Sequence, residues 1–248
     1  MALKVVGVIP ARFASTRFPG KPLAPIAGVS LLERVYRQAE KSGAFAELVA
    51  ATEDERVMEH CELRGMKAQL TSDKHQSGTD RMGEVAGYYP ADAYVNIQGD
   101  EPLVSPQALT ALVAQASAAN AELATLVTPL SPDEDGALDD PNTVKAVIAG
   151  DGRALYFSRS RIPYPRRAEH ARYFQHIGVY YYRKDILEKF VALPVSQLEL
   201  AESLEQLRAL EAGISILAVE CAYRPIAVDV PEDIALVEAE LKHRGSAG

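Results

Sequence analysis

Residues 3–22 read Leu-Lys-Val-Val-Gly-Val-Ile-Pro-Ala-Arg-Phe-Ala-Ser-Thr-Arg-Phe-Pro-Gly-Lys-Pro, and this stretch decides the fold. The apolar run at residues 3–9 predicts a buried strand of a parallel sheet. After the loop, four apolar residues recur at the spacing of one helix face and predict a helix: Leu31, Leu32, Val35 and Ala39. A strand, a loop and a helix in this order are typical of an open α/β sheet, in which ligands bind to the loops at the carboxyl ends of the strands.

The loop between this strand and helix carries three permanent cations, Arg12, Arg17 and Lys21. Residues 1–41 hold seven Lys and Arg against two Glu, a net charge of +5, whereas the whole chain carries −8. Guanidinium groups bind phosphate oxygens in pairs and lysine adds a compact charge, so the loop suits a polyphosphate. A solubilising surface loop is the alternative that charge alone leaves open.

Two common nucleotide-binding motifs are missing from the sequence. Gly20-Lys21 is followed by Pro22 and lacks the upstream glycine of a P-loop, and no Gly-x-Gly-x-x-Gly follows a strand. The P-loop triphosphatase and dinucleotide-binding interpretations therefore lose their main support.

Composition limits the class of protein. The 248 residues are 48% hydrophobic and 24% charged, as in ordinary soluble proteins. The net charge of −8 and pI near 5.2 argue against nucleic-acid binding. Cys61 and Cys221 are too isolated for a zinc site or a disulfide scaffold. With no signal peptide and no apolar run of about 20 residues, we expect a cytoplasmic protein without a membrane segment.

Strand and helix patterns alternate along the chain, which predicts an α/β fold: a Rossmann-like, mostly parallel central sheet flanked by helices. We interpret residues 1–248 as a single domain, with a β-rich arm at about 130–182. Strands are predicted at 48–52, 67–70, 93–97, 123–127, 143–148, 154–157, 174–182, 214–219 and 226–229, and helices at 54–64, 106–119 and 203–212, from Asp80, and from Pro231.

Carboxylates lie at the ends of two of these strands. Asp100 comes just after the strand at 93–97 and is well placed to bind Mg²⁺, which usually takes one or two carboxylates together with phosphate oxygens and water. A simple turn is the alternative for Asp100. Asp229 is the last residue of the predicted strand at 226–229, and its alternative role is to cap the last helix. The acidic run Asp133-Glu134-Asp135 lies between prolines and is interpreted as a solvated turn.

Two polar segments remain ambiguous from residue types alone. The segment 71–79 and Asp80 contain good helix-capping residues, so capping competes with ligand binding there. Segment 158–172 is rich in arginine and lacks periodicity, and we interpret it as a mobile arm.

The pattern Pro-Ala-Arg-x-x-Ser-x-Arg-x-x-x-Lys at residues 10–21 resembles the signature loop of sugar nucleotidyltransferases that use CTP. Further blocks, in the same order, make the whole chain similar to the CMP-Kdo synthetase (3-deoxy-D-manno-octulosonate cytidylyltransferase) family: residues 75–81 (HQSGTDR), 96–102 (NIQGDEP), 154–159 (ALYFSR), 176–180 (HIGVY), 204–208 (LEQLR) and 228–233 (VDVPED). The resemblance implies the nucleotide-diphospho-sugar transferase type of fold, with a small dimerisation arm or lobe that also borders the sugar site.

The resemblance also implies roles for individual residues. Catalysis would depend on Arg12, Arg17, Lys21 and Asp100, and Mg²⁺ would be bound by Asp100 and Asp229. Nucleotide contacts are expected from Ala11, Arg12, Ser15, Arg17, Lys21, Gln76, Ser77, Arg81 and Gln98. Sugar contacts are expected from Arg159, His176, Tyr180, Glu205 and Gln206. Without the resemblance, His176 would be a core residue and Glu205 and Gln206 would lie on a solvated helix face.

The activity implied is transfer of a cytidylyl group from CTP to Kdo, which gives CMP-Kdo and pyrophosphate and activates Kdo for lipopolysaccharide biosynthesis. A homodimer with CTP and Kdo as small-molecule substrates is expected, without nucleic-acid or membrane partners. One alternative is a cytidylyltransferase for another sugar acid or an amino analogue of Kdo. The other is a non-catalytic nucleotide sensor, which the complete set of cations and carboxylates disfavours.

Overall fold

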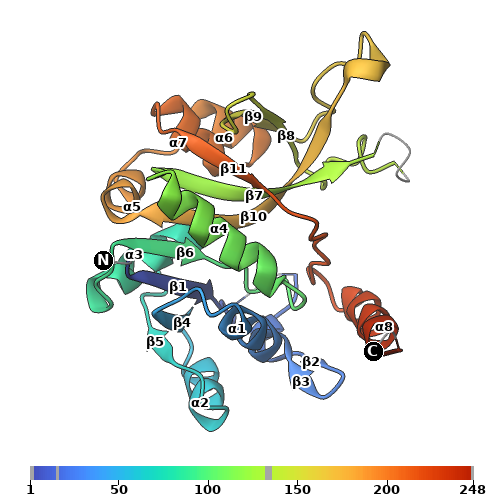
Figure 1. Ribbon diagram of the computed structural model, residues 1–248. Coiled ribbons are helices and arrows are strands. Elements are labelled where there is room, and N and C mark those ends of the chain that lie inside the picture. Colours follow the sequence, from blue (N-terminus) through green and yellow to red (C-terminus); the bar gives the residue numbers. More distant parts are fainter. Residues whose placement is uncertain (1–2, 15–16, 132–135, 247–248) are drawn as a thin grey trace. The chain divides into compact units, whose positions relative to one another are not determined.

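The computed structural model describes residues 3–14, 17–131 and 136–246. The chain divides into two units, each with its own internal contacts. Figure 1 labels the helices and strands of both units. The first unit combines residues 1–110 with the returning segment 224–248, and the second comprises residues 111–223. Helix α4 (Pro106–Ala118) carries the chain from the first unit into the second.

The first unit contains a parallel sheet in the order β6-β1-β4-β5. Its strands are β1 (Val5–Pro10), β4 (Glu47–Thr52), β5 (Ala68–Leu70) and β6 (Ala93–Asn96). All residues of β6 and nearly all of β1 and β4 are buried, as expected for strands covered on both faces. Because the strands are parallel, the loops after β1, β4 and β6 leave the sheet at one edge.

Three helices of the first unit begin at side-chain caps. Helix α1 (Leu31–Lys41) starts after Ser30, α2 (Glu55–Leu63) after Asp54, and α3 (Gly78–Tyr88) after Ser77; each of these caps accepts a hydrogen bond from a backbone N–H of the first turn. Such caps satisfy amides that have no partner within the helix. They also fix where each loop at the sheet edge ends.

The end of the chain packs back into the first unit. A short hairpin, β2 (Pro25–Ile26) and β3 (Val29–Ser30), and the terminal helix α8 (Asp233–Ser246) share an apolar cluster. Its fully buried members are Ile26, Leu31, Leu103, Val228 and Val237. This cluster holds the segment around Asp229 beside the loop that follows β1.

The second unit is a mixed sheet. Strand β11 (Ile216–Glu220) runs parallel to β7 (Leu123–Leu130), and β7 pairs antiparallel with β10 (Tyr173–Arg183). Strand β8 (Lys145–Ile148) pairs antiparallel with both β10 and β9 (Ala154–Ser158). Helices α5 (Lys184–Val191), α6 (Gln197–Glu202) and α7 (Gln206–Glu211) follow β10, and the arginine-rich segment between β9 and β10 contains the short 3₁₀ turn Ala168–His170.

The predicted α/β class with a mostly parallel sheet is confirmed, and two details of the element predictions are corrected. Residues 226–229 form no strand: the Val228 amide makes a single hydrogen bond, of 2.9 Å, to the Asp100 carbonyl. The helix predicted at 203–212 begins later, as α7 at Gln206, because Ser203 after α6 adopts a left-handed conformation with φ of 51°. The acidic run 133–135 and Ser15 lie outside the described residues. Among the described residues, no helix combines the length and apolarity needed to cross a bilayer.

Candidate active site

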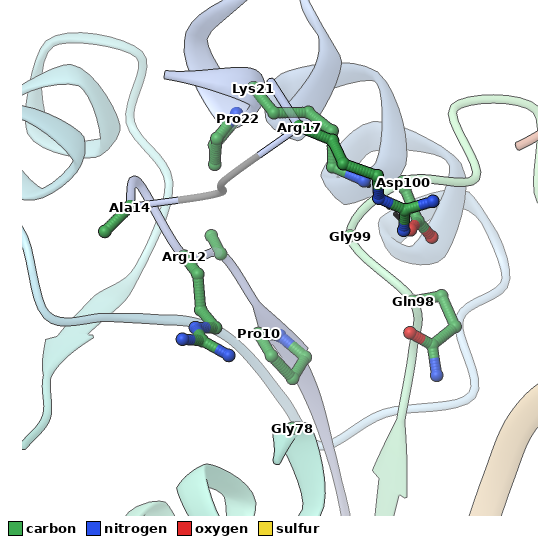
Figure 2. A pocket seen from close by; sticks show the side chains of 11 residues that line it. Pro10, Arg12, Ala14, Arg17, Lys21, Pro22, Gly78, Gln98, Gly99 and Asp100 are labelled. Atoms are coloured by element: carbon green, nitrogen blue, oxygen red, sulfur yellow. Dashed lines mark hydrogen bonds and ion pairs between the residues drawn. The ribbon is translucent and has the colours of Figure 1, made fainter. Parts of the chain in front are cut away.

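A cavity of about 300 Å³ opens at the sheet edge of the first unit. Figure 2 shows side chains around it that come from the loop after β1, from the start of α3 and from the loop after β6. The lining residues are Pro10, Ala11, Arg12, Ala14, Arg17, Lys21, Pro22, Gly78, Gln98, Gly99 and Asp100. The loop that we expected to bind phosphate is therefore part of a cavity wall and not only a surface loop.

Lys21 lies at the centre of a charged cluster in this cavity. Its Nζ is 3.1 Å from Oδ2 of Asp100 and 3.7 Å from Oδ1 of Asp229, and it donates to the Val228 carbonyl at 2.9 Å. Arg17 donates to the same Asp229 oxygen at 3.1 Å. Two carboxylates that are far apart in sequence thus converge on one ammonium group.

Asp229 does not act as the helix cap that sequence alone allowed. The carboxylate of Asp233 instead accepts hydrogen bonds from the amides of Asp229 and Val230, at 2.8 and 3.0 Å. The Asp229 side chain is left to pair with the two cations. Its position, like that of Asp100, agrees with a role at the charged end of the cavity.

A glycine allows the loops after β1 and β6 to approach closely. A Cβ atom at Gly99 would lie 2.4 Å from the carbonyl oxygen of Pro10, a distance that no real side chain tolerates. Glycine at this position lets the backbone preceding Asp100 pass directly over the end of β1. The cluster of Lys21 and Asp100 depends on that approach.

The donor set of the cluster fits a magnesium ion. Asp100 and Asp229 both present a carboxylate oxygen within 3.7 Å of the Lys21 ammonium, which marks a place where negative charge converges. Within the described part of the chain, no three acidic, His or Cys side chains form a metal-binding group. Two carboxylates without further protein ligands suit Mg²⁺, which typically takes its remaining ligands from phosphates and water.

The expected nucleotide residues differ in whether they line the cavity. Ala11, Arg12, Arg17, Lys21 and Gln98 all line the cavity, and in Figure 2 Arg12 lies apart from the Arg17, Lys21 and Asp100 group. Gln76 is exposed and its amide donates to the Lys74 carbonyl. Ser77 forms a capping box with Asp80, so its helix-capping role is present whether or not it also contacts a ligand.

Arg81, expected at the nucleotide, is a buried residue outside the cavity lining. Only 1% of it is exposed, its guanidinium is 3.0 Å from the carboxylate of Glu53, and it donates to the hydroxyl of Thr71. Burial lowers its pKa, while the charge of Glu53 acts in the opposite direction. Its Nε has no hydrogen-bond partner among the described residues, which leaves one donor for a ligand or water.

Three of the expected sugar residues meet in the second unit. The rings of His176 and Tyr180 are 5.4 Å apart, and Nε2 of His176 is 3.1 Å from the hydroxyl of Thr125. Burial lowers the pKa of His176 to about 3, so its ring is neutral at physiological pH. Burial, followed by the charges of Tyr182 and Glu205, raises the pKa of Tyr180 well above its usual value, which places the Glu205 carboxylate near this hydroxyl.

The two remaining sugar candidates differ in what their side chains contact. Gln206 is 3% exposed, and its Nε2 has no hydrogen-bond partner among the described residues. Arg159 instead donates to three backbone carbonyls, those of Glu202, Pro141 and Ser203. Arg159 therefore fixes the turn that precedes Glu205 and Gln206.

Sequence reasoning did not single out Glu53 or Val228. Val228 contributes its carbonyl to Lys21, which no side-chain pattern can indicate. Glu53 directly follows β4, at the same sheet edge as Asp100, and that placement of a carboxylate was the available signal. Its contacts with the loop after β1 arise only in the folded chain.

Comparison with known proteins relates the chain to cytidylyltransferases. A family model described as Cytidylyltransferase matches residues 6–216. A 3-deoxy-manno-octulosonate cytidylyltransferase of Koribacter versatilis (strain Ellin345) is 46% identical over 98% of this chain and 92% of its own length. One from Escherichia coli is 45% identical over 95% of both chains.

Solved structures agree with these relatives. A CMP:2-keto-3-deoxy-manno-octonic acid synthetase in complex with CTP superposes with a TM-score of 0.92 at 44% identity, over 97% of this chain and 99% of that one. A cytidylyltransferase from Leptospira borgpetersenii has a TM-score of 0.65 at 17% identity, over 98% of this chain and 88% of that chain, and this likeness concerns the fold alone.

Proposed function

The chain belongs to the family of 3-deoxy-manno-octulosonate cytidylyltransferases, and from this membership we propose that it transfers a cytidylyl group from CTP to Kdo and releases pyrophosphate. The observation that carries the proposal is the cluster in which Lys21 and Arg17 meet Asp100 and Asp229 beside a cavity. Cations for a triphosphate and carboxylates for a metal ion are the groups that this reaction requires.

Nucleotidyl transfer depends mainly on positioning and on neutralising charge. Arg12, Arg17 and Lys21 bind the triphosphate and stabilise the negative charge that develops on the departing pyrophosphate. The anomeric hydroxyl oxygen of Kdo attacks the α-phosphorus of CTP and loses its proton to water. The bond from that phosphorus to the oxygen bridging the β-phosphate breaks, and pyrophosphate leaves with the electron pair. The cations remain bound to the pyrophosphate as it leaves.

Asp100 and Asp229 are the residues that would hold Mg²⁺. The ion supplies polarisation of the α-phosphate and neutralisation of its charge. The two carboxylates also form ion pairs within the protein. Asp100 pairs with Lys21, and Asp229 pairs with both Lys21 and Arg17. These pairs orient the two cations of the loop.

Kdo recognition is assigned to the second unit. Tyr180, Glu205 and Gln206 combine a buried hydroxyl, a carboxylate and a buried amide nitrogen that has no partner among the described residues, which suits a ligand rich in hydroxyl groups. Neutral His176 contributes a hydrogen bond without adding charge. Arg159 supports the turn that carries Glu205 and Gln206.

Pyrophosphate release from purified protein with CTP, Mg²⁺ and Kdo tests the proposal. We expect release that requires all three together, with little product when UTP replaces CTP or sialic acid replaces Kdo. An amino analogue of Kdo, compared at the same concentration, measures the preference for the sugar. CTP binding without pyrophosphate release for any sugar acid would contradict the proposed activity and favour a sensor.

A further inference from the structure

Glu53 has no role in the assignments above, yet its side chain reaches the loop after β1. Its Oε1 accepts hydrogen bonds from the amides of Phe13, at 2.9 Å, and Ala14, at 3.4 Å. Phe13 directly follows Arg12, the first cation of the loop. A carboxylate from the end of one strand therefore binds the backbone of the loop that follows the neighbouring strand.

The other oxygen of the Glu53 carboxylate pairs with the buried residue Arg81. Oε2 of Glu53 is 3.0 Å from the Arg81 guanidinium, and the exposed fractions of the two side chains are 12% and 1%. Arg81 is itself held by Thr71. A buried guanidinium needs a counter-charge, and Glu53 supplies it for Arg81. The same ion pair holds the Glu53 carboxylate in one orientation.

Phe13 is held by more than Glu53. Its carbonyl accepts a hydrogen bond of 3.0 Å from the Gly20 amide, which closes the loop on itself. The guanidinium of Arg56, at the start of α2, stacks on the Phe13 ring at 3.6 Å from the ring centroid, a cation–π contact. Phe13 is thus a fixed point of the loop between Arg12 and Arg17.

We propose that Glu53 is a positioning residue for the cation-bearing loop: it holds the Phe13 and Ala14 amides against buried Arg81, so that Arg12 and Arg17 line the cavity before the triphosphate binds. The inference rests on the proposed function, because it takes the CTP triphosphate as the ligand of the loop. Holding the loop in its binding conformation reduces the ordering cost of association. Glu53 itself contacts neither substrate.

The kinetic test compares Glu53→Gln with Glu59→Gln, an exposed residue of α2 that undergoes the same change of charge. Loss of a charged hydrogen-bond partner is typically worth about 1.5–3 kcal/mol, so we expect the KM for CTP to rise roughly tenfold or more in Glu53→Gln. The KM for Kdo should stay unchanged, and Glu59→Gln should match the wild type. Equal increases in both KM values would indicate general damage and overturn the proposal.

A second measurement follows the loop without any substrate. Trypsin can cleave after Arg12 and after Arg17, whereas the bond after Lys21 resists cleavage because Pro22 follows it. Mass spectrometry of the peptides gives the rate at each site. We expect both cleavages to be faster in Glu53→Gln than in the wild type and in Glu59→Gln. Unchanged cleavage at these two sites overturns the proposal, whatever the kinetics.

Glu53→Asp keeps the test decisive if Glu53→Gln fails to fold. Aspartate retains the negative charge opposite Arg81 but is one methylene shorter, so it cannot reach both the guanidinium and the loop amides. We expect the same faster cleavage after Arg12 and Arg17, and wild-type rates would overturn the inference. If the wild type releases no pyrophosphate, the proposed function fails, while the trypsin comparison still decides the role of Glu53.

Discussion

At the scale of single residues, the pairing of Asp100 with Lys21 allows a direct test of the metal assignment. Asp100→Asn keeps the shape of the side chain but removes its charge, so we expect turnover to fall by about 100-fold or more, since a metal site supplies several kcal/mol of transition-state stabilisation. Pyrophosphate release across a Mg²⁺ titration measures the effect. Glu232→Gln, at an exposed position near Asp229, is the control. Near-normal turnover of Asp100→Asn at low Mg²⁺ would contradict the assignment.

Glu205 and Gln206 belong to the sugar half of the proposed reaction. Replacing either by alanine should raise the KM for Kdo roughly tenfold while the KM for CTP stays nearly constant, because each removes a hydrogen-bonding group from a buried site. Steady-state kinetics with each substrate varied in turn separates the two constants. Equal damage to both constants would indicate a structural role.

His176 predicts a pH dependence of stability. Burial lowers its folded-state pKa to about 3, below the ordinary value of 6.5, so between these values the unfolded chain binds a proton that the folded chain does not. This contribution to stability is therefore complete above pH 6.5 and decreases as the pH falls. In urea unfolding at pH 7.5 and 5.0, His176→Gln should lose less stability on acidification than the wild type. His243→Gln, at an exposed position of α8, should behave like the wild type. If acidification costs His176→Gln as much stability as it costs the wild type, the explanation is refuted.

Several residues that the sequence assigned to the site do line the cavity, and for these the local sequence pattern already indicated the chemistry of the side chain. Arg12, Arg17, Lys21 and Asp100 all line it, as their positions at strand ends suggested. Arg81 could not be assigned in the same way, because its burial and its pairing with Glu53 result from packing between α3 and the end of β4. A charged residue in sequence does not reveal whether its partner is a ligand or another side chain.

At the scale of elements, two helices begin with a serine capping box, so the effects of removing each serine can be compared. Ser77 caps α3 beside the cavity, and Ser196 caps α6 in the second unit. Each change to alanine should lower the free energy of unfolding by about 1 kcal/mol, as measured by denaturant titration. Only Ser77→Ala should also raise the KM for CTP. If both variants leave that KM unchanged, Ser77 is a cap alone.

Element prediction succeeded where periodic apolar residues and caps coincided, and failed where tertiary contacts decide. The strands β1, β4 and β6 are nearly continuous apolar runs, which local sequence identifies well. The apolar residues at 226–228 predict a strand for the same reason, but Val228 is instead buried in the apolar cluster with Ile26 of β2 and Val237 of α8. Within the described part of the chain, no strand pairs with this segment. Helix α5 follows β10 without a side-chain cap, so its start carried no local signal.

At the scale of the whole molecule, we expect a homodimer. Light scattering should give twice the chain mass of 26.9 kDa at micromolar concentration. Tyr164, 86% exposed in the segment expected to contribute to the dimer, offers a probe: Tyr164→Glu should weaken association, because it replaces an exposed aromatic ring by a charge. Leu63→Glu, 77% exposed on α2 in the first unit, is the matched control. A monomer at all concentrations would contradict the expectation.

The division into two units was beyond the reach of sequence patterns. Regular alternation of strands and helices predicts one α/β body, and no linker composition marks residues 110 or 224. The segment 224–248 belongs to the first unit because Val228 and Val237 pack in one apolar cluster with residues from its beginning: Ile26, Leu31 and Leu103. These residues look alike in sequence, and nothing local indicates that they share one cluster.

The discontinuous first unit has a consequence for protein synthesis. Residues 1–110 are translated before the second unit, whereas Asp229 and α8 follow only after it. At typical elongation rates the intervening residues take roughly 6–23 s to translate. During that time the nascent first unit lacks Val228 and Val237 from its apolar cluster and one of the two carboxylates that pair with Lys21. The continuous second unit can fold during translation, whereas the first can be completed only after Val237 has been translated, and chains that stall before residue 229 lack the second carboxylate that pairs with Lys21.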